Sequence, residues 1–196
     1  MNNKSVKGSM ISGNPAKELI IFAIPMILGN LFQQFYNIAD SVIVGKFLGP
    51  DALAAVGASN SITTLFVMVA IGTGIGCSVI ISQLFGAGRM KDVKSSISTA
   101  LIAIFVFSLI LSTIGFMLSG NILNWMHTPS DVYEEADKYL KIYFLGFAFL
   151  FMYNAFNAVF NALGDSAKPL VFLIFSSVLN IGLDILFVWK FGWGVA

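Results

Sequence analysis

Five long apolar runs, separated by short polar stretches, determine what this chain of 196 residues can fold into. They cover residues 19–45, 52–82, 96–118, 139–163 and 169–189. A helix rises about 1.5 Å per residue, so about 20 residues cross the roughly 30 Å of hydrocarbon in a bilayer. All five runs reach that length, and they lack the alternating pattern of membrane β-strands. The sequence therefore predicts an all-α, polytopic membrane helix bundle with five transmembrane helices.

The composition fits a membrane protein and argues against several other functions. Only 11% of the residues are charged, against about 25% in an ordinary soluble domain. The net charge of +1 gives no reason to expect a nucleic-acid partner. The single cysteine, Cys77, excludes an internal disulfide and a cysteine-rich metal site. We see no nucleophile–base pair and no cofactor loop, so we expect neither an enzyme nor a bound cofactor.

The distribution of basic residues predicts how the chain is oriented. We divide it into a polar cytosolic tail, residues 1–17, and a partial transmembrane lobe, residues 18–196. A cytosolic amino terminus places seven of the eleven basic residues inside, which agrees with the positive-inside rule. In the long outer connection, Thr128 and Pro129 predict the start of the fourth helix, with Thr128 as its N-cap. The inner basic residues are Lys4, Lys7, Lys17, Arg89, Lys91, Lys94 and Lys168.

The first apolar run carries a polar stripe that contains a carboxylate. Its polar residues recur in steps of three and four, so they share about a third of the helix circumference. An ionisable side chain inside a membrane helix costs about 2.5–3.5 kcal/mol on insertion scales and normally faces a protein interior or a wet cavity. An ion or substrate pathway needs such a face. The stripe consists of Asn30, Gln33, Gln34, Asn37, Asp40 and Ser41.

Two further runs hide polar stripes of the same kind. The fifth run has Ser176, Asn180 and Asp184 on one face, and the fourth run has Asn154, Asn157 and Asn161. The economical arrangement is that the three stripes meet. Under the predicted topology Asp40 and Asp184 both lie about 8–9 Å below the outer ends of their helices. Equal depth permits a shared site.

Two carboxylates and an asparagine in a pocket of low dielectric have two plausible uses. They can coordinate a hard cation such as Na⁺, or they can share a proton, because desolvation and close like charge both raise a carboxyl pKa. The competing interpretation is that these groups only bond helices together, at about 0.6 kcal/mol per contact. Pro25 lies inside the first run, where it is either a hinge or a static kink.

The motifs, taken in order, resemble those of the multidrug and toxic compound extrusion (MATE) transporters. The resemblance spans essentially the whole chain after the tail. The motifs are Ile24-Pro25-Met26, Tyr36-Asn37-Ile38-Ala39-Asp40-Ser41-Val42-Ile43-Val44-Gly45, Gly86-Ala87-Gly88-Arg89, Thr128-Pro129, Asn161-Ala162-Leu163-Gly164-Asp165-Ser166, Lys168-Pro169, Asn180 with Asp184, and Gly192-Trp193-Gly194-Val195-Ala196.

This resemblance implies a twelve-helix antiporter of two lobes in the plasma (inner) membrane, exporting organic, often cationic, drugs or toxic compounds against Na⁺ or H⁺ entry. It implies a cation or proton site at Asp40, Asn180 and Asp184, which would also be the Na⁺ site, and a hinge at Pro25. We expect a multi-pass protein with no cofactor beyond the coupling ion. The residues expected to line the substrate cavity are Gln33, Gln34, Tyr36, Asn37, Asn157 and Asn161.

The chain resembles only the first five helices of the first lobe, so we expect an incomplete unit that needs helix 6 and a second lobe. Two alternatives stay open. One is a lipid-linked or polysaccharide flippase of the same superfamily, which we would expect to line its cavity with Arg or Lys; the central parts of the five runs hold neither. The other is a non-transporting membrane subunit whose polar stripes are buried between helices.

Overall fold

The computed structural model describes residues 15–47, 50–184 and 186. It consists of five α-helices, which confirms the predicted helix bundle. The side chains of Asp40 and Asp184 lie outside the described part, although both backbone positions are helical. The helices are α1 (Pro15–Phe47), α2 (Pro50–Gly86), α3 (Met90–Trp125), α4 (Tyr133–Ala162) and α5 (Ala167–Asp184).

Four of these helices are long and apolar enough to cross a membrane. The segments that qualify are Ala16–Ala39, Val56–Gly86, Met90–Trp125 and Tyr133–Ala162. The predicted fifth span, 169–189, extends beyond the described residues, and α5 is described over 18 residues. Apolar side chains such as Phe149, which is 80% exposed, cover much of the outer surface, as in a helix bundle whose solvent is lipid.

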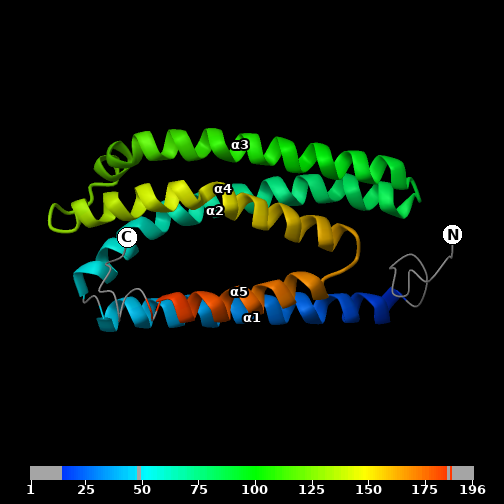
Figure 1. Cartoon of the computed structure of the whole chain (residues 1–196), viewed down its shortest axis with the longest axis horizontal. Coiled ribbons are helices and arrows are strands. Elements are labelled where there is room, and N and C mark those ends of the chain that lie inside the picture. Colours follow the sequence, from blue (N-terminus) through cyan, green and yellow to red (C-terminus); the bar gives the residue numbers. More distant parts are fainter. Residues whose placement is uncertain (1–14, 48–49, 185, 187–196) are drawn as a thin grey trace.

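The helices form two layers (Figure 1). Helices α2, α3 and α4 form one layer, in which α4 packs against both of its neighbours. Helices α1 and α5 form the other, side by side and running in the same direction. The turn between α4 and α5 carries the chain from the first layer to the second. This layering places the polar residues of α1 next to α5.

Aromatic side chains fill the core of the α2–α4 layer. Phe144, Phe147 and Phe151 of α4 are fully buried, and Phe66 of α2 meets the first two edge-on at centroid distances of 5.0 and 5.2 Å. A side chain at Gly115 of α3 would overlap the Phe144 ring, so glycine there allows the two helices to approach. Edge-to-face pairs add about 0.5–1.5 kcal/mol each beyond their burial. This layer is therefore densely packed.

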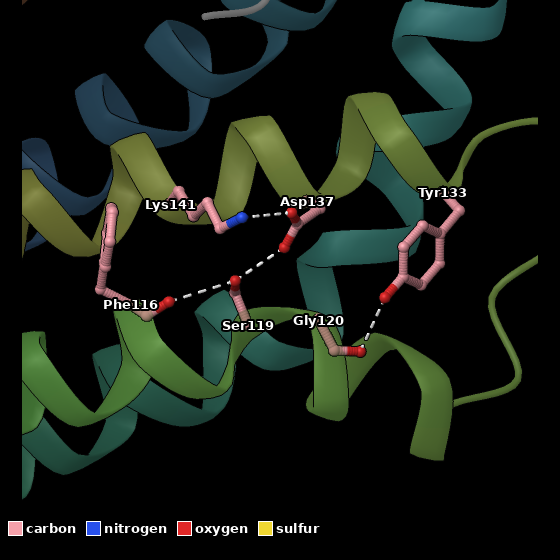
Figure 2. A network of polar contacts seen from close by, with 6 residues as sticks. All are labelled: Phe116, Ser119, Gly120, Tyr133, Asp137 and Lys141. Atoms are coloured by element: carbon pink, nitrogen blue, oxygen red, sulfur yellow. Dashed lines mark hydrogen bonds and ion pairs between the residues drawn. The ribbon is translucent and has the colours of Figure 1, made fainter.

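A polar network joins the ends of α3 and α4 near their connection (Figure 2). Asp137 accepts a hydrogen bond from the Ser119 hydroxyl and forms an ion pair with Lys141, both at 2.7 Å. The Tyr133 hydroxyl donates to the Gly120 carbonyl at 3.0 Å. Ser119 is only 1% exposed, so the network clamps α3 to α4 beside the aromatic core.

The start of α4 differs from the sequence prediction. Thr128 was expected to cap this helix, but α4 begins at Tyr133, after Val132. The reason is that Thr128 helps to close α3: its N–H donates to the Leu123 carbonyl at 3.1 Å, next to His127 with φ 55°. That is the Schellman pattern of a helix C-terminus. The prediction of a Thr128 cap is therefore wrong.

Candidate functional site

The α4–α5 turn is closed by backbone hydrogen bonds that fix its shape. Gly164 has φ +79°, the left-handed conformation that glycine adopts without steric cost. Its N–H donates to the Asn161 carbonyl, and the Asp165 N–H donates to the Phe160 carbonyl, both at 3.0 Å. This is a second Schellman motif. It ends α4 and directs the chain toward α1.

Asp165 then caps the start of α5. Its carboxylate accepts a hydrogen bond from the Lys168 backbone N–H at 3.2 Å and pairs with the Lys168 ammonium at 2.7 Å. The Lys168 hydrogen bond holds the pKa of this carboxyl below its ordinary value, against a smaller opposing effect of burial. Lys168 also lies 5.5 Å from the centroid of the Phe160 ring. These contacts hold the first turn of α5 in place.

A small cavity of about 60 Å³, which we call the polar chamber, lies where α1, α4 and α5 meet. That volume corresponds to about two water molecules at about 30 Å³ each. Its polar residues are Asn30, Gln33, Tyr153, Asn157, Asn161 and Ser166, and its apolar wall is formed by Pro25, Met26, Gly29, Pro169, Leu170 and Leu173.

One oxygen of the polar chamber is free to take a ligand. The Asn161 amide N–H donates to the Asn157 side-chain oxygen at 3.0 Å. The Asn161 Oδ1 atom is buried and has no hydrogen-bond partner among the described residues. A buried carbonyl oxygen without a partner carries a desolvation cost of about 1–3 kcal/mol. It is therefore suited to accept a hydrogen bond from water or substrate, or to coordinate a cation.

The predicted stripe on α1 divides between two cavities. Gln33 and Asn30 line the polar chamber, whereas Gln34 and Asn37 line an open hollow of about 720 Å³ further along α1. Within that hollow the Asn37 amide donates to the Gln34 side-chain oxygen at 3.2 Å. The Tyr36 side chain is half-buried on α1. The stripe is thus polar along its length but does not serve a single pocket.

The residues of the predicted stripe on α4 lie in two different environments. Asn157 and Asn161 face the polar chamber together with Tyr153, which the prediction did not include. Asn154 instead donates to the Leu150 carbonyl of its own helix at 2.9 Å, and its backbone packs against Gly74 of α2. The signal for Tyr153 was its spacing, because residues 153, 157 and 161 repeat every four positions and share one helix face.

Helix α5 lies along α1 in a register that can be read from one hydrogen bond. The Ser166 hydroxyl donates to the Phe22 carbonyl at 2.8 Å, across 144 residues of sequence. Asp40 and Asp184 are also 144 residues apart, since 184 minus 40 is 144. Helices α1 and α5 are parallel and adjacent (Figure 1). The same offset therefore sets both acidic backbone positions at one level.

Asn180 lies one helical turn before Asp184. It is half-buried, and its Oδ1 atom has no partner among the described residues. Like Asn161, it offers an oxygen to a ligand. Whether the Asp40 and Asp184 carboxylates converge concerns side chains outside the described part, so their shared site stays a prediction.

The comparisons with known proteins agree with this architecture. The MatE family model matches residues 25–186. The chain is 36% identical over 184 residues to the probable multidrug resistance protein YpnP of Bacillus subtilis (strain 168), covering 94% of this chain and 41% of that protein. It is 33% identical over 177 residues to the probable multidrug resistance protein YoeA of the same organism, covering 90% of this chain and 38% of that protein.

A solved structure, described as the outward-facing conformation of a multidrug resistance MATE family transporter of the MOP superfamily, matches with a TM-score of 0.91 and 27% identity. The match covers 98% of this chain and 43% of that structure. The chain therefore spans less than half the length of the relatives it matches. Members of the matched family are transporters and not enzymes, which confirms the expected class. On the strength of the model match and of these relatives, the chain belongs to the MatE family of multidrug and toxic compound extrusion proteins.

Proposed function

We propose that this chain is the partial amino-terminal lobe of a cation-coupled secondary antiporter that exports organic, often cationic, drugs or toxic compounds. The observation that supports this most is the parallel register of α1 and α5, which sets Asp40 and Asp184 at the same level. Two relatives are named as probable multidrug resistance proteins. The rest of the transporter would supply helix 6 and the second lobe.

The coupling ion, Na⁺ or H⁺, would bind at Asp40, Asn180 and Asp184. Carboxylate and amide oxygens are the ligands that Na⁺ takes, and a carboxylate pair can equally hold a proton. The unpartnered Asn180 Oδ1 supplies one such oxygen. Ion binding would favour one conformation of the lobe and substrate binding the other, so each ligand shifts the population against its competitor.

Neutral polar groups would form the path through the lobe. Gln33, Asn157 and Asn161 surround the polar chamber, and Gln34 and Asn37 line the open hollow. Tyr36 would lie at the boundary of this path on α1. Pro25 lines the polar chamber as well, where loss of one backbone hydrogen bond makes α1 bend more easily. We propose that α1 hinges there as the ion site changes occupancy.

The distribution of charge supports a proposal for the orientation and for the class of cargo. We propose a plasma (inner) membrane location with the amino terminus in the cytosol, on the positive-inside count. Among the described residues, the linings of the polar chamber and the open hollow contain neither Lys nor Arg. A flippase for anionic head groups would need such residues, so the lining favours a cationic or neutral cargo.

The test uses the full-length transporter. Asp40→Asn and Asp184→Asn keep side-chain size and remove charge, and we expect both to abolish cation-coupled efflux of a fluorescent cationic dye at normal expression. Asp137→Asn is the matched control, because it makes the same change in the α3–α4 network, outside the site. Wild-type coupled efflux in the first two variants would refute the proposed ion site.

A labelling experiment separates a transporter from a subunit with dry helix contacts. We expect a cysteine at position 37 to react with a membrane-impermeant thiol reagent, because Asn37 lines the open hollow. A cysteine at position 35 is the control, since Phe35 is 68% exposed on an apolar face and would meet lipid. Equal protection of both positions would favour the non-transporting subunit.

A further inference from the structure

Ser166 forms a buried hydrogen bond between the α4–α5 turn and α1. Its side chain is 6% exposed, and its hydroxyl donates to the Phe22 carbonyl at 2.8 Å. Phe22 lies three residues before Pro25 and Ser166 one residue before α5. The bond therefore links the α4–α5 turn, just before α5 begins, to the part of α1 that precedes its proline.

The Ser166 hydroxyl can bond to α1 because Asp165, and not Ser166, accepts the hydrogen bond from the first turn of α5. A serine just before a helix normally accepts a hydrogen bond from an N–H of the first turn. Here Asp165 does so, since its carboxylate accepts the Lys168 N–H. The left-handed Gly164 and its two Schellman hydrogen bonds fix the turn that presents Ser166 to α1. Ser166 is thus held in place by its surroundings and aimed across to the other helix.

Apart from this bond, the described contact between α1 and α5 near the polar chamber is apolar. A β-carbon at Gly29 would lie 3.7 Å from Leu173 Cδ2 and 3.9 Å from Leu170 Cδ1, which is ordinary contact. Leucine side chains against a glycine supply area and little directional preference, because hydrophobic contact is non-directional. A hydrogen bond, in contrast, has a narrow range of distance and angle. Of the contacts described at this end, the Ser166 bond is the one that specifies register.

We propose that Ser166 is a positioning residue that sets the axial register of α5 along α1, and through it the alignment of Asn180 and Asp184 with Asp40. This rests on the proposed ion site in its second part only. The hydrogen bond and the two acidic positions share the offset of 144 residues. Because both helices rise about 1.5 Å per residue, an offset fixed at Ser166 is transmitted along α5 to Asp184, 18 residues away.

The register can be measured without transport. In the full-length protein carrying Cys77→Ser, we would compare disulfide formation for Gly29→Cys paired with Leu173→Cys and for Gly29→Cys paired with Leu170→Cys. The ratio of the two rates reports where α5 lies along α1. We expect Ser166→Ala to change this ratio at least twofold and Ser166→Thr, which keeps a hydroxyl, to restore it.

Matched controls guard against a general effect of mutation. Ser176→Ala removes a hydroxyl from α5, where among the described residues it donates to the Leu173 carbonyl of α5 itself at 3.0 Å, and should leave the ratio unchanged. If Ser166→Ala does not fold, Ser166→Val against Ser166→Thr compares two side chains of the same shape with and without the hydroxyl. An unchanged ratio in every hydroxyl-free variant at position 166 would overturn the inference.

The second measurement concerns the ion site. We expect Ser166→Ala to raise the cation concentration that half-saturates efflux by about two- to tenfold, the equilibrium change equivalent to one hydrogen bond, with a smaller change in maximal rate. A shifted cross-linking ratio with unaltered cation dependence would refute the link to the ion site. If efflux by the unmutated protein does not depend on a cation, the proposed function is refuted. The cross-linking ratio would still test whether Ser166 sets the register of α5.

Discussion

Replacing Gly164 by alanine tests whether the α4–α5 turn has the conformation described above. Gly164 has φ +79° and lies between α4 and α5. A β-carbon built there meets no atom within 4 Å, so the substitution adds no steric clash with the rest of the protein. Its cost is therefore that of holding an alanine in a left-handed conformation.

That cost can be stated in advance. A non-glycine residue in the left-handed region loses about 1–2 kcal/mol relative to glycine. Two Schellman hydrogen bonds depend on this conformation, and escape from the strain would break them at about 0.5–1.5 kcal/mol each. We therefore expect Gly164→Ala to lower the free energy of unfolding by about 1–2 kcal/mol. Gly164→Asn should cost less, because asparagine tolerates this region.

The assay is reversible unfolding in mixed detergent micelles, followed by tryptophan fluorescence and far-UV circular dichroism on the full-length protein. Gly146→Ala is the control: Gly146 lies inside α4, and a β-carbon there also meets nothing within 4 Å. Alanine is favoured over glycine in a helix by about 1 kcal/mol, so this variant should be more stable. The same sign and size for both substitutions would refute the left-handed turn.

Two further predictions concern the α2–α4 layer. Gly115→Ala should destabilise the protein by about 1–3 kcal/mol in the same unfolding assay, because the new methyl group overlaps the buried Phe144 ring; Gly115→Ala with wild-type stability would contradict the close approach of α3 and α4. Asp137→Asn should lower stability by about 1–2 kcal/mol, because it weakens the bonds to Ser119 and Lys141, while leaving the cation dependence of efflux unchanged. Altered cation dependence in this variant would show that the network is part of the ion pathway.

The length and hydropathy of the apolar runs predicted much of this architecture from the sequence. The five apolar runs correspond to the five helices, because length and hydropathy are sufficient to define helices in a bilayer. The helix ends were less accessible. Helix α3 begins at Met90 rather than near residue 96, since Arg89 and Asp92 form an ion pair at 2.7 Å across the first turn. Polar residues of this kind extend a helix beyond its apolar run.

The polar site was predicted by residue type and only partly by position. Asn157 and Asn161 line the polar chamber, while the Asn154 side chain donates to a carbonyl of its own helix. In the sequence, an asparagine that lines a cavity cannot be told from one that bonds to its own helix. The difference depends on the neighbouring helices. Ser166 was recognised as part of a motif but not as a contact. Its partner is a backbone carbonyl 144 residues away, which no side-chain pattern can reveal.

The two layers are held together by different contacts, and this difference suggests which helices can move. Helices α2, α3 and α4 share an aromatic core and the Asp137 network. Helices α1 and α5 contact each other far more than they contact that layer, and a polar chamber lies where the two layers meet.

Regions with few buried apolar contacts open at lower free energy. We therefore expect hydrogen exchange in the full-length protein to be slower in α4 than in α1, and to accelerate in α1 first when the proposed coupling ion is removed. Acceleration that begins in the aromatic core would contradict this division, because the densely packed layer would then be the part that responds to the ion.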